Sequence, residues 1–179
     1  MPYLVAAVVL TGVLGVLNLL LTTAVIRKLR ERPSDALRDF NVELEELPAG
    51  MRVPDFHAES VSGSLVNPSA LAGAEAIIAF FDTNCDACKP AVGELVKYAR
   101  ARDMRPKQVV AVIGGEVTDA LFYLEGLNGV ATVITEEGMG PVTSAFSLQG
   151  VPAYCIVDGD GVIVRSGNTK TGLNPRARI

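Results

Sequence analysis

The hydrophobic positions of this chain fall into two regions with different patterns. From Pro2 to Ile26 there is no charged residue, and Asn18 is the only strongly polar one. From Met51 onward, short apolar runs alternate with amphipathic segments, which is typical of an α/β domain. Prolines and a glycine bound the stretch between them, which indicates a linker. The expected parts are an N-terminal membrane anchor with a basic flank at residues 1–32, a linker at residues 33–50 and a folded domain at residues 51–179.

The N-terminal apolar stretch predicts one transmembrane helix. At about 1.5 Å per residue its length is roughly 37 Å, enough to cross a hydrocarbon core of about 30 Å. A cleaved signal peptide would show a basic start, a shorter apolar run and a small-residue cleavage site, and the sequence has none of these features. A buried core helix is the alternative. An uncharged terminal stretch of this length favours a retained, single-pass anchor in the cell membrane.

The residues after this stretch bear on which side of the membrane the domain faces. Four basic residues and one acidic residue give a local charge of +3, and they are Arg27, Lys28, Arg30, Arg32 and Glu31. The other end of the stretch offers only the α-amino group. Because basic residues are enriched on the cytoplasmic side, this flank argues for a cytoplasmic domain.

The folded domain is expected to contain six strands when the N-terminal hairpin is counted as one. The apolar run from Ala76 to Phe81 is typical of a central strand buried on both faces. The other strand segments are an irregular hairpin at residues 53–66 with its turn at Gly63, and residues 108–113, 130–134, 153–157 and 162–165.

Two amphipathic segments predict helices, and a third helix-like stretch precedes the last two strands. The first helix is expected to begin at a pair of cysteines, where Thr83 or Asn84 can cap it. The second runs from Thr118 to Glu125 and is expected to end at Gly126.

Charge and cysteine content narrow the possible functions. The net charge of −4 and the absence of tryptophan argue against a nucleic-acid partner, which requires a basic face. Three cysteines are too few for a disulfide scaffold. Two of them, Cys85 and Cys88, have C-x-x-C spacing, which points to reactivity instead of folding.

The C-x-x-C motif follows a predicted buried strand and opens an amphipathic helix. This spacing brings the two sulfurs close enough to bond. The free N–H groups and the dipole of a helix start stabilise a thiolate on the first cysteine. Cys85 is therefore the candidate nucleophile, and Cys88 is the candidate residue that resolves a mixed disulfide.

The alternatives for this motif are half of a zinc site or two unreactive core thiols. A structural zinc site needs four nitrogen or sulfur ligands, commonly from a second pair of similar spacing. Only Cys155 and His57 remain, and neither is paired nor close in sequence. Redox chemistry without a metal or a cofactor is the preferred interpretation.

A second motif, Gly150-Val151-Pro152, opens the strand at 153–157. The C-x-x-C motif and this second motif together resemble those of the membrane-anchored thioredoxin-like proteins that include TlpA, ResA and MauD-type accessory proteins. The resemblance rests on FFDTNCDACKP and QGVPAYCIVDGDGVIV, with VPDF and GSLVNPSALAG before them, and covers roughly residues 51–166. It implies a thioredoxin-like α/β fold, with a mixed central sheet flanked by helices and an N-terminal hairpin extension, preceded by the transmembrane helix.

The resemblance also implies which residues form the site, which partners the protein has and on which side of the membrane the domain lies. Val151–Pro152 would be a cis peptide beside the cysteines, with backbone that pairs with a substrate chain. Cys155 would be buried and inert. The partners would be protein thiols or disulfides, an upstream redox protein and the membrane. The domain would face the extracytoplasmic side, against the charge flank.

Several positions depart from the pattern of these families. Ala79 stands where many thioredoxins carry a buried aspartate, and Ala91 where ResA-like proteins carry a glutamate. Asn84 replaces the usual tryptophan before the first cysteine. The remaining candidates for an acid–base helper are carboxylates that are more typical of a solvated surface, namely Asp82, Glu94 and Glu116.

The charge of Asp86, between the cysteines, opposes a thiolate on Cys85 and so favours a reductase over a strong oxidant. Two related classes of protein do not fit the sequence. A peroxiredoxin would need Thr or Ser at position 82 and Pro at position 78, where this chain has Asp and Ile. A Sco-type copper chaperone would need C-x-x-x-C and a downstream histidine, whereas this chain has C-x-x-C and its histidine, His57, lies upstream. A non-turnover assembly factor or chaperone for a cysteine-containing partner, such as a cytochrome or an amine dehydrogenase, remains the alternative.

Overall fold

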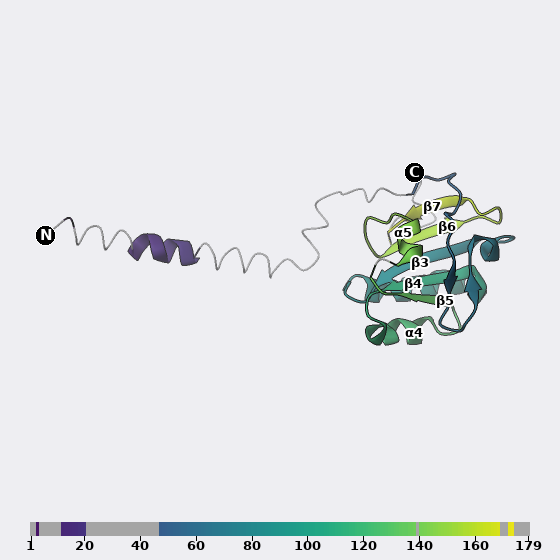
Figure 1. Cartoon of the computed structure of the whole chain (residues 1–179), viewed down its shortest axis with the longest axis horizontal. Coiled ribbons are helices and arrows are strands. Elements are labelled where there is room, and N and C mark those ends of the chain that lie inside the picture. The colour runs from purple at the N-terminus through teal and green to yellow at the C-terminus, as the bar shows by residue number, and fades with distance from the viewer. Residues whose placement is uncertain (1–2, 4–11, 21–46, 139, 169–171, 174–179) are drawn as a thin grey trace. The chain divides into compact units, whose positions relative to one another are not determined.

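The computed structural model describes residues 3, 12–20, 47–138, 140–168 and 172–173. The chain divides into two compact units, residues 1–42 and 43–179 (Figure 1). In the first unit, residues 12–20 are helical. Within the described ranges, no helix combines the length and the apolar character needed to cross a membrane. The expected basic flank and most of the expected linker lie outside the described residues.

The second unit is built on a five-stranded mixed sheet in the order β5-β4-β3-β6-β7 (Figure 1). The central strand β3 pairs in parallel with β4 and antiparallel with β6. At the edges, β5 is parallel to β4 and β7 is antiparallel to β6. The strands are β3 (Ala76–Asp82), β4 (Val109–Gly114), β5 (Thr132–Glu136), β6 (Ala153–Val157) and β7 (Ile163–Gly167).

Strand β3 is central because nearly every side chain in it is apolar and buried. Successive side chains of a strand point to opposite faces. Ile77 and Phe81 accordingly belong to a hydrophobic cluster on one face of the sheet, and Ile78 and Phe80 to a cluster on the other. The sequence expectation of a strand buried on both faces is confirmed.

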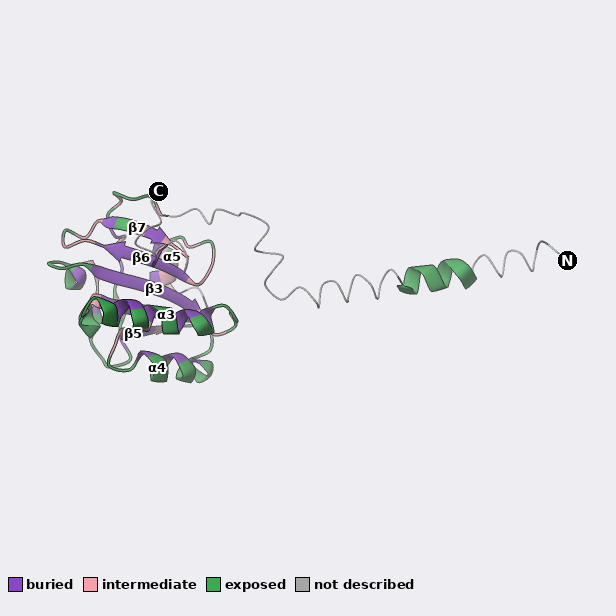
Figure 2. Ribbon diagram, turned by 180° about the vertical axis from the view of Figure 1, so that it is seen from behind, coloured by how far each residue is buried: buried purple, intermediate pink, exposed green. Residues whose placement is uncertain are grey.

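Helices cover both faces of the sheet. The amphipathic helix α3 (Cys88–Ala101) and the shorter α4 (Leu121–Leu127) contribute to the cluster around Ile77. Figure 2 shows α3 in front of the sheet, with its buried side toward the strands and its exposed side outward. Helix α5 (Pro141–Ala145) contributes to the opposite cluster. Short 3-10 helices precede β3, β4 and α4, and they are η1 (Pro68–Leu71), η2 (Pro106–Gln108) and η3 (Val117–Ala120).

The expected N-terminal hairpin is present, but its ladder is short. Strands β1 (Ala58–Glu59) and β2 (Leu65–Val66) pair antiparallel, and Gly63 lies in the turn with a φ of 80°. Val53 and Phe56, expected within the first strand, instead bury their side chains on the α5 face of the sheet.

Several element boundaries differ from the sequence expectation. Residues Val117–Ala120 form the 3-10 helix η3, so the second α-helix begins at Leu121 and not at Thr118. The second helix does not end at Gly126, because α4 continues to Leu127. An added Cβ at Gly126 would lie 3.2 Å from Val92 Cγ1, so this glycine permits close packing of α4 on α3. Strand β5 begins at residue 132 and not 130, because the N–H groups of residues 130 and 131 both bond the Leu127 carbonyl at 3.0 Å.

Candidate functional site

The turn that carries the first cysteine begins at the carboxyl end of β3. Asp82 Oδ1 accepts the backbone N–H of Asn84 at 2.7 Å, and the Asp82 carbonyl accepts the N–H of Cys85 at 3.2 Å. Side chains of Asp commonly stabilise turns in this way. Asp82, one of the expected acid–base candidates, thus has its side chain bonded to the turn itself.

The helix after this turn starts later than the sequence predicts. Its first residue is Cys88, its N-cap is Ala87, and no side chain caps it. The predicted cap by Thr83 or Asn84 is therefore wrong. The reason is local, because the tight turn from Asp82 places these two residues ahead of the helix, and the Cys88 N–H bonds the Cys85 carbonyl at 3.0 Å.

Cys85 is partly exposed and lies beside a segment that is distant in sequence. Its Sγ donates a hydrogen bond to the carbonyl oxygen of Val151 over 3.6 Å. The Val151–Pro152 peptide bond is cis, as the sequence resemblance implied. Both residues are half-buried, so part of their backbone remains accessible next to the Cys85 thiol.

Cys88 is fully buried behind Cys85. Burial, together with a hydrogen bond to the Cys85 side chain, raises the pKa of the Cys88 thiol well above its ordinary value. The two cysteines thus differ in environment, one accessible and one enclosed and held as a neutral thiol. Neither cysteine is in a disulfide in this structure.

Tyr123 is a residue of the site that the sequence interpretation missed. Its hydroxyl donates to the Asp82 carbonyl at 2.9 Å, the same oxygen that accepts Cys85 N–H. Burial, with smaller contributions from Cys88, Cys85 and the nearby aspartates, raises the pKa of Tyr123 to about 12. No local sequence signal identifies it, since a tyrosine on the inner face of an amphipathic helix is typical of the core.

The end of β4 and the residue after it contact the turn that carries Cys85. Thr83 N–H bonds the Gly114 carbonyl at 3.0 Å. The next residue, Gly115, has a φ of 106°, and a Cβ there would overlap Thr83 Oγ1. Only glycine fits this position without strain. The glycine pair after an apolar strand was the available sequence signal for such a close approach.

Glu136 anchors the helix that leads to Val151, and it too was not singled out from the sequence. Its carboxylate is buried at the end of β5 and accepts Val142 N–H at 2.6 Å and Thr143 N–H at 3.1 Å. It also accepts the Thr143 hydroxyl at 2.7 Å. A negative charge at a helix N-terminus is favourable because it faces unpaired N–H groups.

The other residues considered from the sequence do not join the cysteine pair. Glu94 is on the exposed face of α3 in an ion pair of 2.8 Å with Lys97, and Glu116 is exposed. His57 is exposed, and Cys155 is buried on the opposite face of the sheet. Over the residues that the structure describes, no cluster of three or more His, Cys, Asp or Glu side chains could hold a metal ion.

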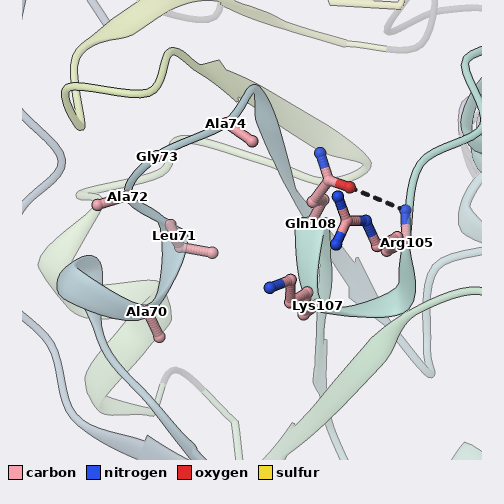
Figure 3. A pocket seen from close by; sticks show the side chains of 8 residues that line it. All are labelled: Ala70, Leu71, Ala72, Gly73, Ala74, Arg105, Lys107 and Gln108. Carbon is pink, nitrogen blue, oxygen red and sulfur yellow. Dashed lines mark hydrogen bonds between the residues drawn. The ribbon is translucent and has the colours of Figure 1, made fainter.

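A pocket of about 160 Å³ lies elsewhere, between η1 and η2 (Figure 3). It is lined by residues 70–74 together with Arg105, Lys107 and Gln108. These segments precede β3 and β4, whereas Cys85 follows the carboxyl end of β3. A strand of seven residues separates the two ends by roughly 20 Å. Since ligands of open α/β sheets bind at the carboxyl ends of the strands, this pocket is not part of the cysteine site.

No protein-family model matches the sequence, and no curated protein matches it. Solved structures do match about two thirds of the chain or somewhat more. The thioredoxin domain of a thiol-disulfide oxidoreductase from Bacteroides vulgatus is 19% identical, with a TM-score of 0.57 over 67% of this chain and 88% of that one. A putative thiol:disulfide interchange protein DsbE from Chlorobium tepidum is 22% identical, with a TM-score of 0.55 over 72% and 89%.

A secreted disulfide oxidoreductase from Mycobacterium tuberculosis is 20% identical, with a TM-score of 0.53 over 70% of this chain and 87% of that one. All three are similar in the arrangement of strands and helices and distant in sequence. The chain therefore carries a thioredoxin-like α/β domain, with its C-x-x-C motif at the carboxyl end of the central strand.

Proposed function

We propose that this chain is a membrane-anchored thiol–disulfide oxidoreductase that reduces disulfides in proteins. One observation carries the proposal. The partly exposed Cys85 thiol lies 3.6 Å from the Val151 carbonyl, next to a cis proline, with Cys88 buried behind it. This arrangement combines an accessible nucleophile, an enclosed second thiol and an adjacent backbone on which a substrate can bind.

The reaction follows from the two cysteine environments. The Cys85 thiolate attacks one sulfur of the substrate disulfide, forms a Cys85–substrate disulfide and releases the other substrate sulfur, which takes up a proton. Cys88 then loses its proton and attacks Cys85 Sγ, which releases the second substrate thiol. The products are two substrate thiols and a Cys85–Cys88 disulfide, so two electrons pass from the pair to the substrate. An upstream dithiol protein returns the pair to the reduced form.

The segment Val151–Pro152 supports binding of an extended substrate chain. Its backbone is partly accessible directly beside the nucleophile, at the start of β6. A substrate strand can pair with such backbone by main-chain hydrogen bonds, which bind the chain without selecting its sequence. The sulfur of a substrate cysteine is thereby held next to Cys85 Sγ.

The proposed direction of electron flow, from the cysteine pair to the substrate, rests on the position of Asp86. This residue is exposed between the cysteines, where its negative charge opposes a thiolate on Cys85. A less stable thiolate destabilises the reduced pair, which makes it a better electron donor. The sequence resemblance to TlpA, ResA and MauD-type proteins supports the same class of activity.

The anchor and its orientation are part of the proposal. The uncharged stretch from Pro2 to Ile26 supports a single membrane pass, and a reductase has its clearest use in an oxidising, extracytoplasmic compartment. A cysteine introduced at the exposed Ser62, in a chain whose own cysteines are replaced, reports the side. Labelling by an impermeant thiol reagent in intact cells is expected, and labelling only after lysis would place the domain in the cytoplasm.

The test of the activity is a redox titration of the full chain in detergent, scored by thiol alkylation, with Cys85→Ser and Cys88→Ser variants alongside. A two-electron transition near the thioredoxin value of about −270 mV, lost in both variants, is expected. A much higher potential would indicate an oxidase or an isomerase. Absence of any reversible transition would overturn the redox proposal in favour of an assembly factor that holds its partner's cysteines without turnover.

A further inference from the structure

The carbonyl oxygen of Asp82 links the cysteine turn to helix α4. It accepts the Cys85 N–H at 3.2 Å from within the turn and the Tyr123 hydroxyl at 2.9 Å from α4. A carbonyl oxygen has two lone pairs, so both bonds can form together. The position of the Cys85 backbone therefore depends on the Tyr123 side chain, which follows Asp82 by 41 residues in the sequence.

The ring of Tyr123 is itself held firmly in place. It packs against Phe81 with a centroid distance of 5.9 Å and edge-on against Phe122 at 5.4 Å. Only 1% of the residue is exposed. Because aromatic contacts of this kind fix the ring, its hydroxyl points at one acceptor and not at solvent. This is a second, independent feature that suits the residue to hold the turn.

Resting on the proposed disulfide reductase activity, we infer that Tyr123 is a positioning residue for that reaction. Its hydroxyl holds the Asp82–Cys85 turn so that Cys85 Sγ stays beside the Val151 carbonyl, where the substrate strand binds. The role belongs to the hydroxyl and not to the ring. Tyr123 does not touch the substrate and does not transfer a proton.

A positioning role fits the chemistry of this group better than an acid–base role. Burial is the main cause of the raised pKa of Tyr123, and the negative charges that Cys88, Cys85, Asp82 and Asp86 can carry raise this pKa further. With a pKa of about 12, Tyr123 is a neutral hydrogen-bond donor throughout the working range of a thiol enzyme. Loss of the Tyr123 hydroxyl should therefore change the geometry of the turn without changing the pH at which the cysteines titrate.

The experiment compares Tyr123→Phe with the wild-type full chain in detergent, and with Tyr98→Phe as a control. Tyr98, in the last part of α3, is also a buried tyrosine on this face of the sheet. Its ring, however, packs against the Arg102 guanidinium, whose Cζ lies 4.1 Å from the ring centroid. Two reactions are measured from pH 6 to 9. One is reduction of a disulfide-bonded peptide by the dithiol form, and the other is alkylation of Cys85 by iodoacetamide.

Tyr123→Phe is expected to slow peptide reduction by about two- to tenfold, the effect of one ordinary hydrogen bond. Alkylation should change less than about twofold, because a small reagent does not use the Val151 backbone. The pH midpoint of alkylation should stay at its wild-type value. Tyr98→Phe should match the wild type in both reactions.

Amide hydrogen exchange of residues 83–85 provides a direct measure of the turn that does not depend on activity. It is expected to be faster in Tyr123→Phe and unchanged in Tyr98→Phe. Unchanged peptide reduction in Tyr123→Phe, an equal loss in both reactions, or a shifted pH midpoint would each overturn the positioning role. A wild-type chain that reduces no disulfide would instead overturn the proposed function on which the inference rests.

Discussion

Cys155 and Cys88 lie on opposite faces of the central sheet, and both are fully buried. Cys155 is opposite Ile78 in the β3–β6 ladder and packs in the α5 cluster, whereas Cys88 packs in the cluster under α3. The sheet itself separates the two sulfurs. Cys155 therefore cannot exchange with the redox pair while the sheet is intact, which agrees with the inert role that the sequence resemblance implied.

The first prediction concerns the order in which the three cysteines react with N-ethylmaleimide. Cys85 should react first, since it alone is partly exposed. Burial raises the pKa of Cys155 to about 12, which lowers its thiolate fraction at pH 8 by roughly a thousandfold. Cys155 in the folded chain should thus react at least about a hundredfold more slowly than in urea. Mass spectrometry of quenched samples gives the order, and early labelling of Cys155 would contradict this fold.

The second prediction concerns stability at high pH. The pKa of Cys155 rises from 9.0 to about 12 on folding because of burial, so the folded chain keeps a proton that the unfolded chain loses. The contribution of the Cys155 thiol to the free energy of unfolding is fully present below pH 9 and is lost as the pH rises toward 12. The slope is about 1.4 kcal/mol per pH unit for each such group.

Cys155→Ala should accordingly flatten this dependence by about 1.4 kcal/mol per pH unit between pH 9 and 12, although its stability at pH 7 will be lower because a cavity forms. Urea unfolding at pH 8, 9, 10 and 11 measures both effects. Part of the slope should remain, since burial also raises the pKa values of Cys88 and Tyr123. Parallel curves for the two proteins would show that Cys155 does not carry this linkage.

The third prediction concerns the buried carboxylate of Glu136. Glu136→Gln retains the shape but loses the charge and at least one of its three hydrogen bonds at α5. We expect a loss of about 1–3 kcal/mol in the free energy of unfolding. Glu94→Gln is the matched control, because it breaks only an exposed ion pair and should cost about 0.5 kcal/mol or less.

Gly140→Ala tests the same contact from the other side. A Cβ at this position would lie 2.5 Å from the Glu136 carboxyl carbon, so the carboxylate must move out of its hydrogen bonds. The φ of Gly140 is −73°, which alanine adopts without strain. A loss similar to that of Glu136→Gln is expected in urea unfolding. Full stability in either variant would mean that the carboxylate does not hold α5.

The fourth prediction compares two glycines with positive φ. Gly129 has a φ of 68° and open space around its Cα, so Gly129→Ala should cost only the backbone penalty of about 1 kcal/mol. At Gly115 the φ is 106°, and a Cβ would also overlap the Thr83 side chain. Gly115→Ala should therefore cost at least about 2 kcal/mol.

The same pair of variants probes the site. Gly115→Ala displaces the turn that leads to Cys85, so it should slow reduction of a peptide disulfide, whereas Gly129→Ala should not. Thermal unfolding and initial rates on both variants measure the two effects. Equal stabilities for the two variants would show that Thr83 moves aside without cost.

The sequence by itself determined the parts of this protein that depend on neighbouring residues. The apolar run of β3 predicted a strand buried on both faces, and the alternation of strand and helix patterns predicted an α/β domain. The position of Cys85 and Cys88 between a strand and a helix pointed to redox chemistry. These signals are local, because periodicity and three-residue spacing are set by the geometry of a single element.

Only the tertiary structure decided how distant segments meet. It placed the Tyr123 hydroxyl on the Asp82 carbonyl, and it placed the Val151 carbonyl beside Cys85, 66 positions away, which only the family resemblance had implied. It also carried α4 through Gly126, where close packing on Val92 outweighs the weak helix propensity of glycine. Such contacts depend on how the helices and the sheet pack together, and no pattern within one segment encodes the partner that it will meet.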